Sequence, residues 1–387
     1  MDQLLKPTTA ESKPTLFFLK NKEDKEAFEN LFKKDCIKHI NDDYKEQLSE
    51  LFAIENPKLV FSPDFENKLE EYLAKVQKKS PLSEQGTWVY YPWLSRVVHV
   101  LPDKEFQKVR TARNKLLITD KEQQAFYNQV IGVAGLSVGN SVALTTILQG
   151  GSKHIKIADH DILELSNLNR IRVGVDSLAV PKVEATAREI YLINPYAIVE
   201  VFPNGITEEN IKDFFKGLDV VVDEIDELSK KHLLRQYAQK NRIPLVSGAD
   251  NADQAVVDIE RYDLDKNTKF FHGKITASYE DLQDMDKFET GKNIAQLIGL
   301  ENHEERMLES LQAMGKKIAS WPQLGGTAML NGAAVAYCLR RIANKQSVIG
   351  KRTVFALDKA FDPEFMSQKS KKRRKGAIEA FKKIFKK

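Results

Sequence analysis

One stretch of the chain, residues 129–182, constrains the fold more than any other, because a short apolar segment runs directly into a glycine turn. Residues 130–134 are apolar and β-rich, which is typical of a strand buried in a parallel sheet. Gly135 and Gly139 frame the turn, and apolar residues at helical spacing follow it. Such a turn lets the backbone approach a phosphate, which the free N–H groups of a helix N-terminus attract. The stretch therefore predicts an anion site at the end of the first strand.

The second predicted strand, residues 154–158, ends at Asp159. This acid follows the glycine turn by roughly 20 residues, the distance at which a dinucleotide-binding unit places an acid on a ribose hydroxyl. The turn itself, Gly135-Leu-Ser137-Val-Gly139, differs from G-x-G-x-x-G, and similar turns occur in sheets that bind no nucleotide. The turn alone therefore leaves the ligand open.

The polar residues that follow Asp159 favour a nucleotide. Asn167, Arg170 and Lys182 would bring an amide and two cations to the edge of the sheet that holds Asp159. Two cations beside a phosphate turn are what a triphosphate requires, since its charge must be neutralised.

With these residues in place, the chain resembles the ThiF/MoeB/ubiquitin-activating-enzyme superfamily, and within it a divergent bacterial branch without zinc or catalytic-cysteine motifs. The resemblance covers about residues 110–263, with a weaker match at 321–343. The motifs that carry it are Arg110-Thr-Ala-Arg113-Asn114, Asp159-x-Asp161-x-x-x-x-Ser166-Asn167-Leu168-x-Arg170, Pro181-Lys182-Val183, Ile193-Asn194-Pro195, Asp219-Val-Val-Val-Asp223-Glu-Ile-Asp226 and the run 243–249.

The resemblance implies a site for ATP and Mg²⁺ in an adenylyltransferase. The catalytic residues implied are Arg113, Arg170, Lys182 and Asp226. The nucleotide-binding residues implied are Gly135, Ser137, Gly139, Asp159, Asp161, Asn167, Arg170 and Lys182. Asp226 would hold the metal, because Mg²⁺ needs only one or two carboxylates besides phosphate oxygens.

Two of these roles have competitors. Asp223 lies on the same edge as Asp226, and an aspartate that caps the following helix would look the same in sequence. Arg113 would reach across a homodimer to the partner's triphosphate, but its segment is also consistent with a solvated basic helix face.

The chain departs from the superfamily pattern at three points. Ser137, Val138 and Asn140 stand where Gly-Gly-x-Gly would align, no zinc module is present, and no cysteine follows the nucleotide site. Cys36 and Cys338 are the only cysteines, and Cys338 lies in an apolar helical run where a buried thiol is expected. We therefore expect neither zinc nor a thioester intermediate.

Predicted strands alternate with predicted helices from residue 130 to 262, which is typical of a parallel sheet with helices on both faces. The predicted fold is α/β, a Rossmann-like doubly wound and mainly parallel sheet with an N-terminal α+β accessory domain. An antiparallel strand is expected at 254–262. The predicted domains are an accessory domain at 1–101, an ATP-binding adenylation domain at 102–360 and a basic C-terminal tail at 361–387. Residues 266–317 are expected to form a charged, mostly helical insertion.

The N-terminal part combines predicted helices at 24–34, 46–51 and 65–76 with β-like segments at 59–61, 87–93 and 97–101. Its aromatic cluster of Trp88, Tyr90, Tyr91 and Trp93 favours core packing, with a clamp for substrate or partner as the alternative.

The net charge of +4 conceals an asymmetry, because residues 369–387 hold ten Lys or Arg and one acid, which leaves −5 for the rest of the chain. Ile378, Phe381, Ile384 and Phe385 recur among these lysines at helical spacing. The tail could contact nucleic acid or an anionic membrane, or be a disordered solubilising end. Its deletion is expected to leave ATP turnover intact. With no apolar run of about 20 residues and no basic-apolar leader, we expect a cytoplasmic protein.

The leading functional prediction is ATP-dependent adenylation of a carboxylate, giving an acyl-adenylate and pyrophosphate. The substrate would be a peptide, a ubiquitin-like or sulfur-carrier-like C-terminus, or a small acid. The alternatives are a tRNA-modifying ATP-dependent dehydratase of the same superfamily and a nucleotide-binding scaffold that has lost catalysis.

Overall fold

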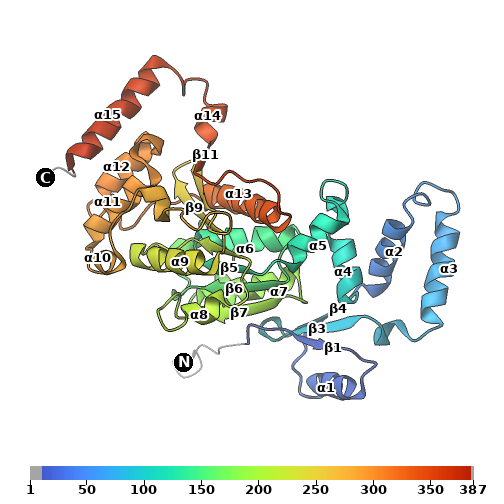
Figure 1. Ribbon diagram of the computed structural model, residues 1–387. Helices are drawn as coiled ribbons and strands as arrows, with labels where there is room; N and C mark the ends of the chain where they lie inside the picture. The colour runs from blue at the N-terminus through green and yellow to red at the C-terminus, as the bar shows by residue number, and fades with distance from the viewer. Residues whose placement is uncertain (1–10, 385–387) are drawn as a thin grey trace. The chain divides into compact units, whose positions relative to one another are not determined.

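The computed structural model describes residues 11–384, and for residues 287, 288, 301 and 384 the backbone only. The chain divides into two compact units, one of residues 11–120 with 190–196, and one of 121–189 with the residues from 197 onward (Figure 1). Helix α4 (Asp103–Arg110) and the 3-10 helix η3 (Ala112–Asn114) therefore group with the N-terminal unit. The domain limits predicted above stay a prediction, and the leader prediction concerns residues 1–10, which lie outside the described residues.

The N-terminal unit is built on a four-stranded sheet in the order β1-β3-β4-β2, in which β2 and β4 are parallel and the other pairs antiparallel. Trp88 and Tyr91 are buried, which confirms core packing for these two rings. The elements are β1 (Thr15–Phe17), α1 (Lys22–Lys33), β2 (His39–Asp42), α2 (Tyr44–Glu55), α3 (Phe65–Gln77), η1 (Leu82–Glu84), β3 (Thr87–Tyr91), η2 (Pro92–Leu94) and β4 (Arg96–Val100).

Residues 190–196 complete this unit although they lie far along the chain. The Tyr91 hydroxyl donates a hydrogen bond to the Tyr191 carbonyl at 3.2 Å, and the Tyr196 hydroxyl donates to the Leu101 carbonyl at 2.6 Å. The Gln107 amide donates to Asn194 Oδ1 at 2.9 Å. The unit is therefore discontinuous in sequence.

The strand expected at residues 59–61 is wrong, because these residues form a turn. The N–H of Leu59 donates to the Asn56 carbonyl, and the N–H of Ser62 donates to the Leu59 carbonyl. These bonds use the backbone groups locally, and Phe61 is 92% exposed. These three apolar residues bury little surface, so no hydrophobic gain holds them in a strand.

The second unit contains a seven-stranded sheet in the order β11-β10-β9-β8-β5-β6-β7. Strands β5 to β9 are parallel, and β10 and β11 are antiparallel to their neighbours, as predicted for residues 254–262. The mainly parallel, Rossmann-like prediction is confirmed. The elements of the sheet region are α5 (Asp120–Asn128), β5 (Ile131–Ala134), α6 (Val138–Leu148), β6 (His154–Ala158), η4 (Leu165–Asn167), η5 (Val175–Ser177), α7 (Lys182–Ile193), β7 (Ile198–Phe202), α8 (Ile211–Phe215), β8 (Val220–Asp223), α9 (Leu228–Asn241), β9 (Leu245–Asn251), β10 (Gln254–Glu260), α13 (Gly325–Ala343), β11 (Thr353–Ala356) and α14 (Leu357–Phe361).

Helices cover both faces of this sheet. A Cβ at Gly132 would meet Phe214 of α8, whereas a Cβ at Gly139 of α6 would meet Val133. Gly132 and Val133 are neighbours in β5 and point to opposite faces, so α6 and α8 lie on opposite sides of the sheet. Helix α8 begins at Ile211, after Thr207 and Asn210 close a turn by mutual side chain to backbone hydrogen bonds.

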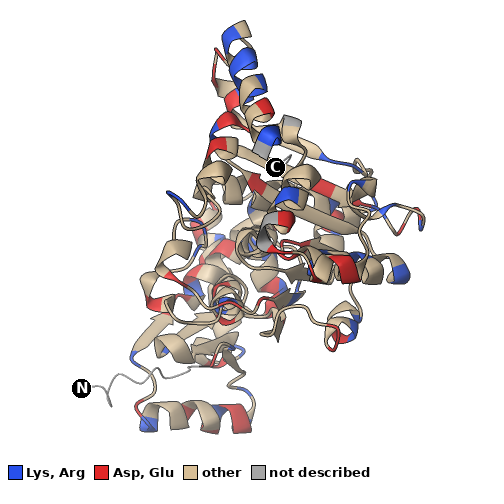
Figure 2. Cartoon of the chain, turned by 90° about the vertical axis from the view of Figure 1, so that its left-hand side faces the viewer, with Lys and Arg blue, Asp and Glu red and all other residues tan. Residues whose placement is uncertain are grey.

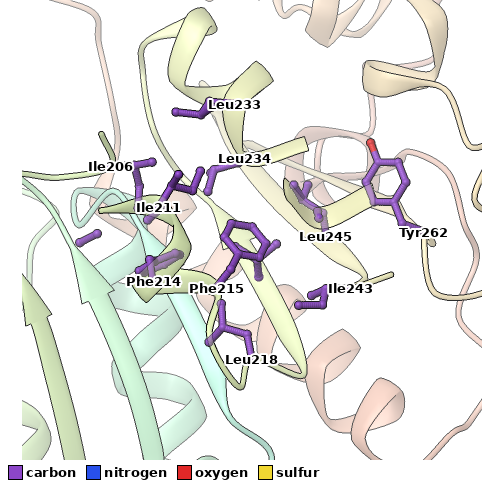
Figure 3. Close-up of a cluster of buried hydrophobic side chains, with 14 of the residues drawn as sticks. Ile206, Ile211, Phe214, Phe215, Leu218, Leu233, Leu234, Ile243, Leu245 and Tyr262 are labelled. Carbon is purple, nitrogen blue, oxygen red and sulfur yellow. The ribbon is translucent and has the colours of Figure 1, made fainter. Parts of the chain in front are cut away.

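A cluster of buried hydrophobic side chains lies between the sheet and helices α8 and α9 (Figure 3). Phe214, Phe215, Leu233 and Leu234 from the helices pack there against Leu245 of β9. Burial of such side chains contributes about 1.5–3 kcal/mol each relative to exposure. The cluster also includes Ala134, Ala158 and Val221 of the central strands β5, β6 and β8.

Residues 266–317 form the predicted helical insertion, and α15 (Gln368–Ile384) packs against its helix α12, with Phe381 buried beside Ala295 and Leu308. The alternative of a disordered end is therefore wrong for 368–384, while Phe385 lies outside the described residues. Lys and Arg recur along α15 (Figure 2). No helix of the described residues is both long and apolar enough for a membrane span. The insertion consists of η6 (Phe270–Gly273), α10 (Tyr279–Gln283), α11 (Lys287–Ile298), η7 (Leu300–Asn302) and α12 (Glu305–Ala313).

Candidate functional site

The glycine turn joins β5 to α6 at the centre of the sheet. Gly135 has φ +88°, and a Cβ there would lie 2.3 Å from the Glu224 carbonyl oxygen, so only glycine fits. A Cβ at Gly139 would lie 2.9 Å from Val133 Cγ1. The absence of a side chain at Gly139 therefore lets α6 approach the strand closely. Asn140, where a glycine would align, is buried; its side chain bonds Thr186 on α7 and the N–H of Arg172. This asparagine stabilises the turn by anchoring α6.

Asp159 ends β6 and holds the turn in place. Its Oδ2 accepts a hydrogen bond from the N–H of Leu136 at 2.6 Å, and its Oδ1 accepts one from the N–H of Asp161 at 2.8 Å. Asp161 in turn pairs with Lys182 Nζ at 2.6 Å. The contact with Lys182 holds the pKa of Asp161 below its usual value despite partial burial, which acts in the opposite direction. The sequence thus brings an acid and a cation to one edge of the sheet.

Arg170 contacts the glycine turn through Ser137. Its Nε donates to Ser137 Oγ at 2.8 Å, and its Nη1 donates to Asn169 Oδ1 at 3.0 Å. Burial lowers the pKa of this guanidinium, and attraction by Asp226 and Asp250 opposes that effect. Arg170 therefore brings a positive charge to the start of α6, where Asp226 and Asp250 attract it.

Two pockets open at the carboxyl ends of β5 and β8, where the strand order reverses and ligands of doubly wound sheets bind. The first pocket has a volume of about 380 Å³, and six of the predicted site residues line it: Gly135, Ser137, Asp159, Asp161, Lys182 and Asp226. The second pocket, of about 320 Å³, shares Ser137, Glu224, Ile225 and Asp226 with the first. It extends over β9 to the helical insertion and to Trp321.

Three carboxyl groups of these pockets have raised pKa values. Burial raises the pKa of Glu224 to about 8 and that of Asp250 to about 6. Burial also raises the pKa of Asp226, against the attraction of Lys231, Lys182 and Arg170. Groups with such shifts gather at functional sites more often than elsewhere.

Asp223 is not part of either pocket. It is fully buried and pairs with Lys231 at 3.1 Å and with Arg235 at 2.6 Å. Burial would raise its pKa, but these two cations hold it below the usual value. Its contacts are those of a structural ion pair, which separates it from Asp226 in the first pocket.

Four predicted site residues line neither pocket: Arg113, Gly139, Asn167 and Arg170, the last of which contacts the glycine turn instead. The Asn167 side chain accepts a hydrogen bond from the N–H of Glu164 and closes the turn of η4. Arg113 is exposed on η3 in the N-terminal unit. Gly139 acts through helix packing, as described above. Sequence reasoning also missed Glu224 and Asp250, although each is an acid at the carboxyl end of a predicted apolar strand, which is the available signal.

The described residues contain one group with metal-ligand spacing, Asp159, His160 and Asp161, whose ligand atoms lie within 4.8 Å of one another. Both carboxylate oxygens of Asp159 already accept backbone hydrogen bonds, and Asp161 pairs with Lys182. Cys36 and Cys338 are free thiols, and burial raises the pKa of Cys338 to about 11, so this thiol is protonated at neutral pH. The sequence predicted a buried thiol, and the structure leaves Cys338 half-buried.

A glycine turn, an acid after the second strand and two cations at the switch point define a Rossmann-like nucleotide-binding domain. A family profile described as "ThiF family" matches residues 111–314, more than half of the sequence. The chain belongs to the ThiF family, within the ThiF/MoeB/ubiquitin-activating-enzyme superfamily of adenylyltransferases.

Among curated relatives, the chain is 34% identical over 288 residues to "Uncharacterized protein MT1398" of Mycobacterium tuberculosis, covering 73% of this chain and 40% of that protein. It thus spans less than half the length of that relative. It is 28% identical over 172 residues to the "tRNA threonylcarbamoyladenosine dehydratase" of Bacillus subtilis, covering 42% of this chain and 68% of that one. Among solved structures, E. coli TcdA matches with a TM-score of 0.44 and 21% identity over 62% of this chain and 95% of TcdA. E. coli MccB matches with a TM-score of 0.47 and 17% identity over 67% of this chain and 78% of MccB.

Proposed function

We propose that this protein adenylates a substrate carboxylate with ATP. The observation that carries the proposal is the arrangement of Lys182 and Asp226 in one pocket, with Arg170 bonded to the glycine turn beside it. A carboxylate oxygen would attack the α-phosphorus of ATP, the bond to the β-phosphate would break, and pyrophosphate would leave with the electron pair. The attacking group is already an anion, so the step needs no general base.

The residues act by charge and position. Lys182 and Arg170 neutralise the phosphates as negative charge shifts to the leaving group. Asp159 holds the glycine turn by accepting a hydrogen bond from the N–H of Leu136, and it lies where it would contact a ribose. When nucleotide enters, Asp159 would exchange or share its hydrogen bonds to backbone N–H groups. Holding the carboxylate and the α-phosphorus together supplies the rest of the rate enhancement.

Magnesium fits the chemistry of Asp226. The side chain lines the first pocket; burial raises its pKa, and the attraction of Lys231, Lys182 and Arg170 opposes that rise. One carboxylate with phosphate oxygens and waters is the ligand set that Mg²⁺ accepts. The ion would neutralise charge on the phosphates of ATP. We further infer from the superfamily resemblance a homodimer in which Arg113 serves the partner's site.

The experiment is ATP–pyrophosphate exchange by the wild type and Asp226→Asn, with pooled peptide and carboxylic-acid substrates. Exchange by the variant should fall by about 100-fold or more, as on removal of one charge-stabilising group. Glu364→Gln, which also removes one exposed carboxylate, is the control and should exchange at the wild-type rate. Absence of exchange with every pool, despite ATP binding, would favour a scaffold; absence of ATP binding would refute the proposal.

A nucleic-acid substrate is a second candidate, favoured by the basic helix α15 and by the relatives named as tRNA dehydratases. Binding through α15 should weaken steeply with salt, because lysines displace counterions from the phosphates. Titration of tRNA at 50 and 200 mM salt, with 369–387 deleted as the comparison, tests it. Binding that survives the deletion would exclude α15 as the contact.

A further inference from the structure

The second pocket has two unlike walls. One consists of the acids Glu224, Asp226 and Asp250, and the other is formed by the apolar side chains of Ile294, Ile298, Met314 and Trp321. Asp250 lies on β9, Glu224 and Asp226 follow β8, and the apolar residues belong to the insertion and the segment that follows it. A pocket of about 320 Å³ is large enough for a small organic molecule.

The acidic wall carries an acceptor without a donor. Asp250 is 5% exposed, and its Oδ1 accepts a hydrogen bond from Asn331 Nδ2 at 2.6 Å. Its Oδ2 is buried and has no hydrogen-bond partner among the described residues, and the same holds for Oδ1 of the fully buried Asn331. Two acceptors cannot satisfy each other, so Asp250, which lines the pocket, keeps capacity for a further donor.

Gly248 of β9 makes room for the acidic wall. A Cβ at Gly248 would lie 2.7 Å from Glu224 Oε1 and 3.1 Å from Asn331 Oδ1. The N–H of Gly248 also donates to Glu224 Oε1 at 2.9 Å. The glycine thus lets the two side chains converge beside Asp250.

The charge of this wall is wrong for a simple anion. Glu224 is protonated at neutral pH, whereas ionised Asp250, with a pKa of about 6, would repel an incoming carboxylate. Lys231 is paired with Asp223, and Arg170 is the cation that interacts with Asp226 and Asp250. A substrate that carries its own cation would remove the conflict, because its N–H groups would meet Asp250 while its carboxylate turned toward Arg170 and the first pocket.

We propose that the second pocket binds a carboxylate substrate bearing an ammonium group and an apolar side chain, that is, a free apolar amino acid. Asp250 accepts its ammonium hydrogens, Asn331 positions Asp250 from behind the pocket wall, and Ile294, Met314 and Trp321 contact its side chain. This inference rests on the proposed adenylation. The amide nitrogen of a protein C-terminus carries no charge, so the acidic wall favours the free amino acid over that substrate.

The first test is binding without chemistry. Calorimetric titration of the full chain with leucine or phenylalanine, with a non-hydrolysable ATP analogue present, should give binding. The N-acetyl derivatives, which lack the charge, should bind at least about tenfold more weakly. Equal or tighter binding of the N-acetyl derivatives would overturn the inference, whether or not the protein catalyses exchange.

The second test is ATP–pyrophosphate exchange with the same compounds. Asp250→Asn keeps the Asn331 contact but removes the charge, so the KM for leucine should rise by at least about tenfold. ATP affinity should stay within about twofold, since Asp250 does not line the first pocket. Glu364→Gln should change neither.

The outcomes separate the two proposals. Exchange with peptides or N-acetyl acids but not with free amino acids would support adenylation and overturn the inference about the second pocket. Amino-acid binding that depends on Asp250, without exchange, would support the pocket and refute the catalytic proposal. An unchanged KM in Asp250→Asn would overturn the role of this residue.

Discussion

At the scale of single residues, Arg235 determines how the region around the site is built. It is 2% exposed, and its guanidinium pairs with Asp223 at 2.6 Å and with Glu260 at 2.8 Å. It also lies 3.9 Å from the centroid of the Phe271 ring. One side chain of α9 thus joins β8, β10 and the start of the insertion, and it fixes the end of β8 from which Glu224 and Asp226 follow.

We predict that Arg235→Leu destabilises the fold by about 3–5 kcal/mol, because it leaves two buried carboxylates without their cation. Urea denaturation measures the effect. Lys240→Ala, an exposed cation on the same helix, should stay within about 0.5 kcal/mol of wild type. A similar small loss for both variants would contradict the assigned role of Arg235.

Glu224 gives a pH dependence of known sign. Its pKa is about 8 in the folded protein, against an ordinary value of 4.5. Between these values the folded state keeps a proton that the unfolded state has lost, so the free energy of unfolding falls as pH rises from about 4.5 to about 8. Asp223 and Asp250 repel the ionised carboxylate and Lys231 attracts it. Melting curves of Glu224→Gln across this range should show a flatter decline than wild type; parallel profiles would refute the shift.

Much of the site edge could be predicted at this scale, and its chemistry only in part. Asp159, Lys182 and Asp226 were identifiable because they follow apolar strands or helix starts whose positions are local properties of the sequence. Glu224 and Asp250 acquire their environment from contacts across strands, such as the bond between Gly248 and Glu224, and no local pattern specifies such contacts. The same limit applies to Asn167, whose partner Glu164 decides that it caps a turn.

At the scale of elements, close packing of α13 against α6 stabilises the glycine turn. Helix α13 contacts α6, β9 and β10, and a Cβ at Gly332 would lie 2.7 Å from the Ser141 carbonyl oxygen. The glycine lets the two backbones approach. Because α6 begins at the turn, a displacement of α13 would move the residues that line both pockets.

Gly332→Val should destabilise the protein by about 1–3 kcal/mol, the usual cost of forcing volume into a packed core. Gly376→Ala on α15 is the contrasting variant, since a Cβ there meets nothing within 4 Å. It should be neutral or stabilising by up to about 1 kcal/mol, as alanine has the higher helix propensity. Thermal melts of both variants decide the matter, and a neutral Gly332→Val would contradict the close approach.

The elements of the sheet were the easiest to predict, since buried parallel strands are continuous apolar runs and their helices have amphipathic spacing. The segment at 59–61 was misjudged because three apolar residues predict burial only where a neighbouring strand exists. Phe61 has none.

At the scale of the whole molecule, the C-terminal helix combines structure with charge. Deletion of 369–387 removes Phe381 from its contacts with Leu308 and Ala295, so the melting temperature should fall. Nucleotide affinity should remain within about twofold of wild type, because α15 does not line the first pocket. Thermal melts and nucleotide titrations measure both quantities, and a lost ATP affinity would show that α15 supports the nucleotide site.

The placement of residues 190–196 has a consequence for how such a protein can be recombined. These residues end α7 yet complete the N-terminal unit through Tyr191, Asn194 and Tyr196. A unit assembled from two separate stretches cannot be gained, lost or exchanged by joining sequence at one terminus. A chimera that takes only residues 1–120 from a relative would keep a foreign 190–196. Inheritance of the accessory unit therefore requires matched changes inside the nucleotide-binding part of the chain.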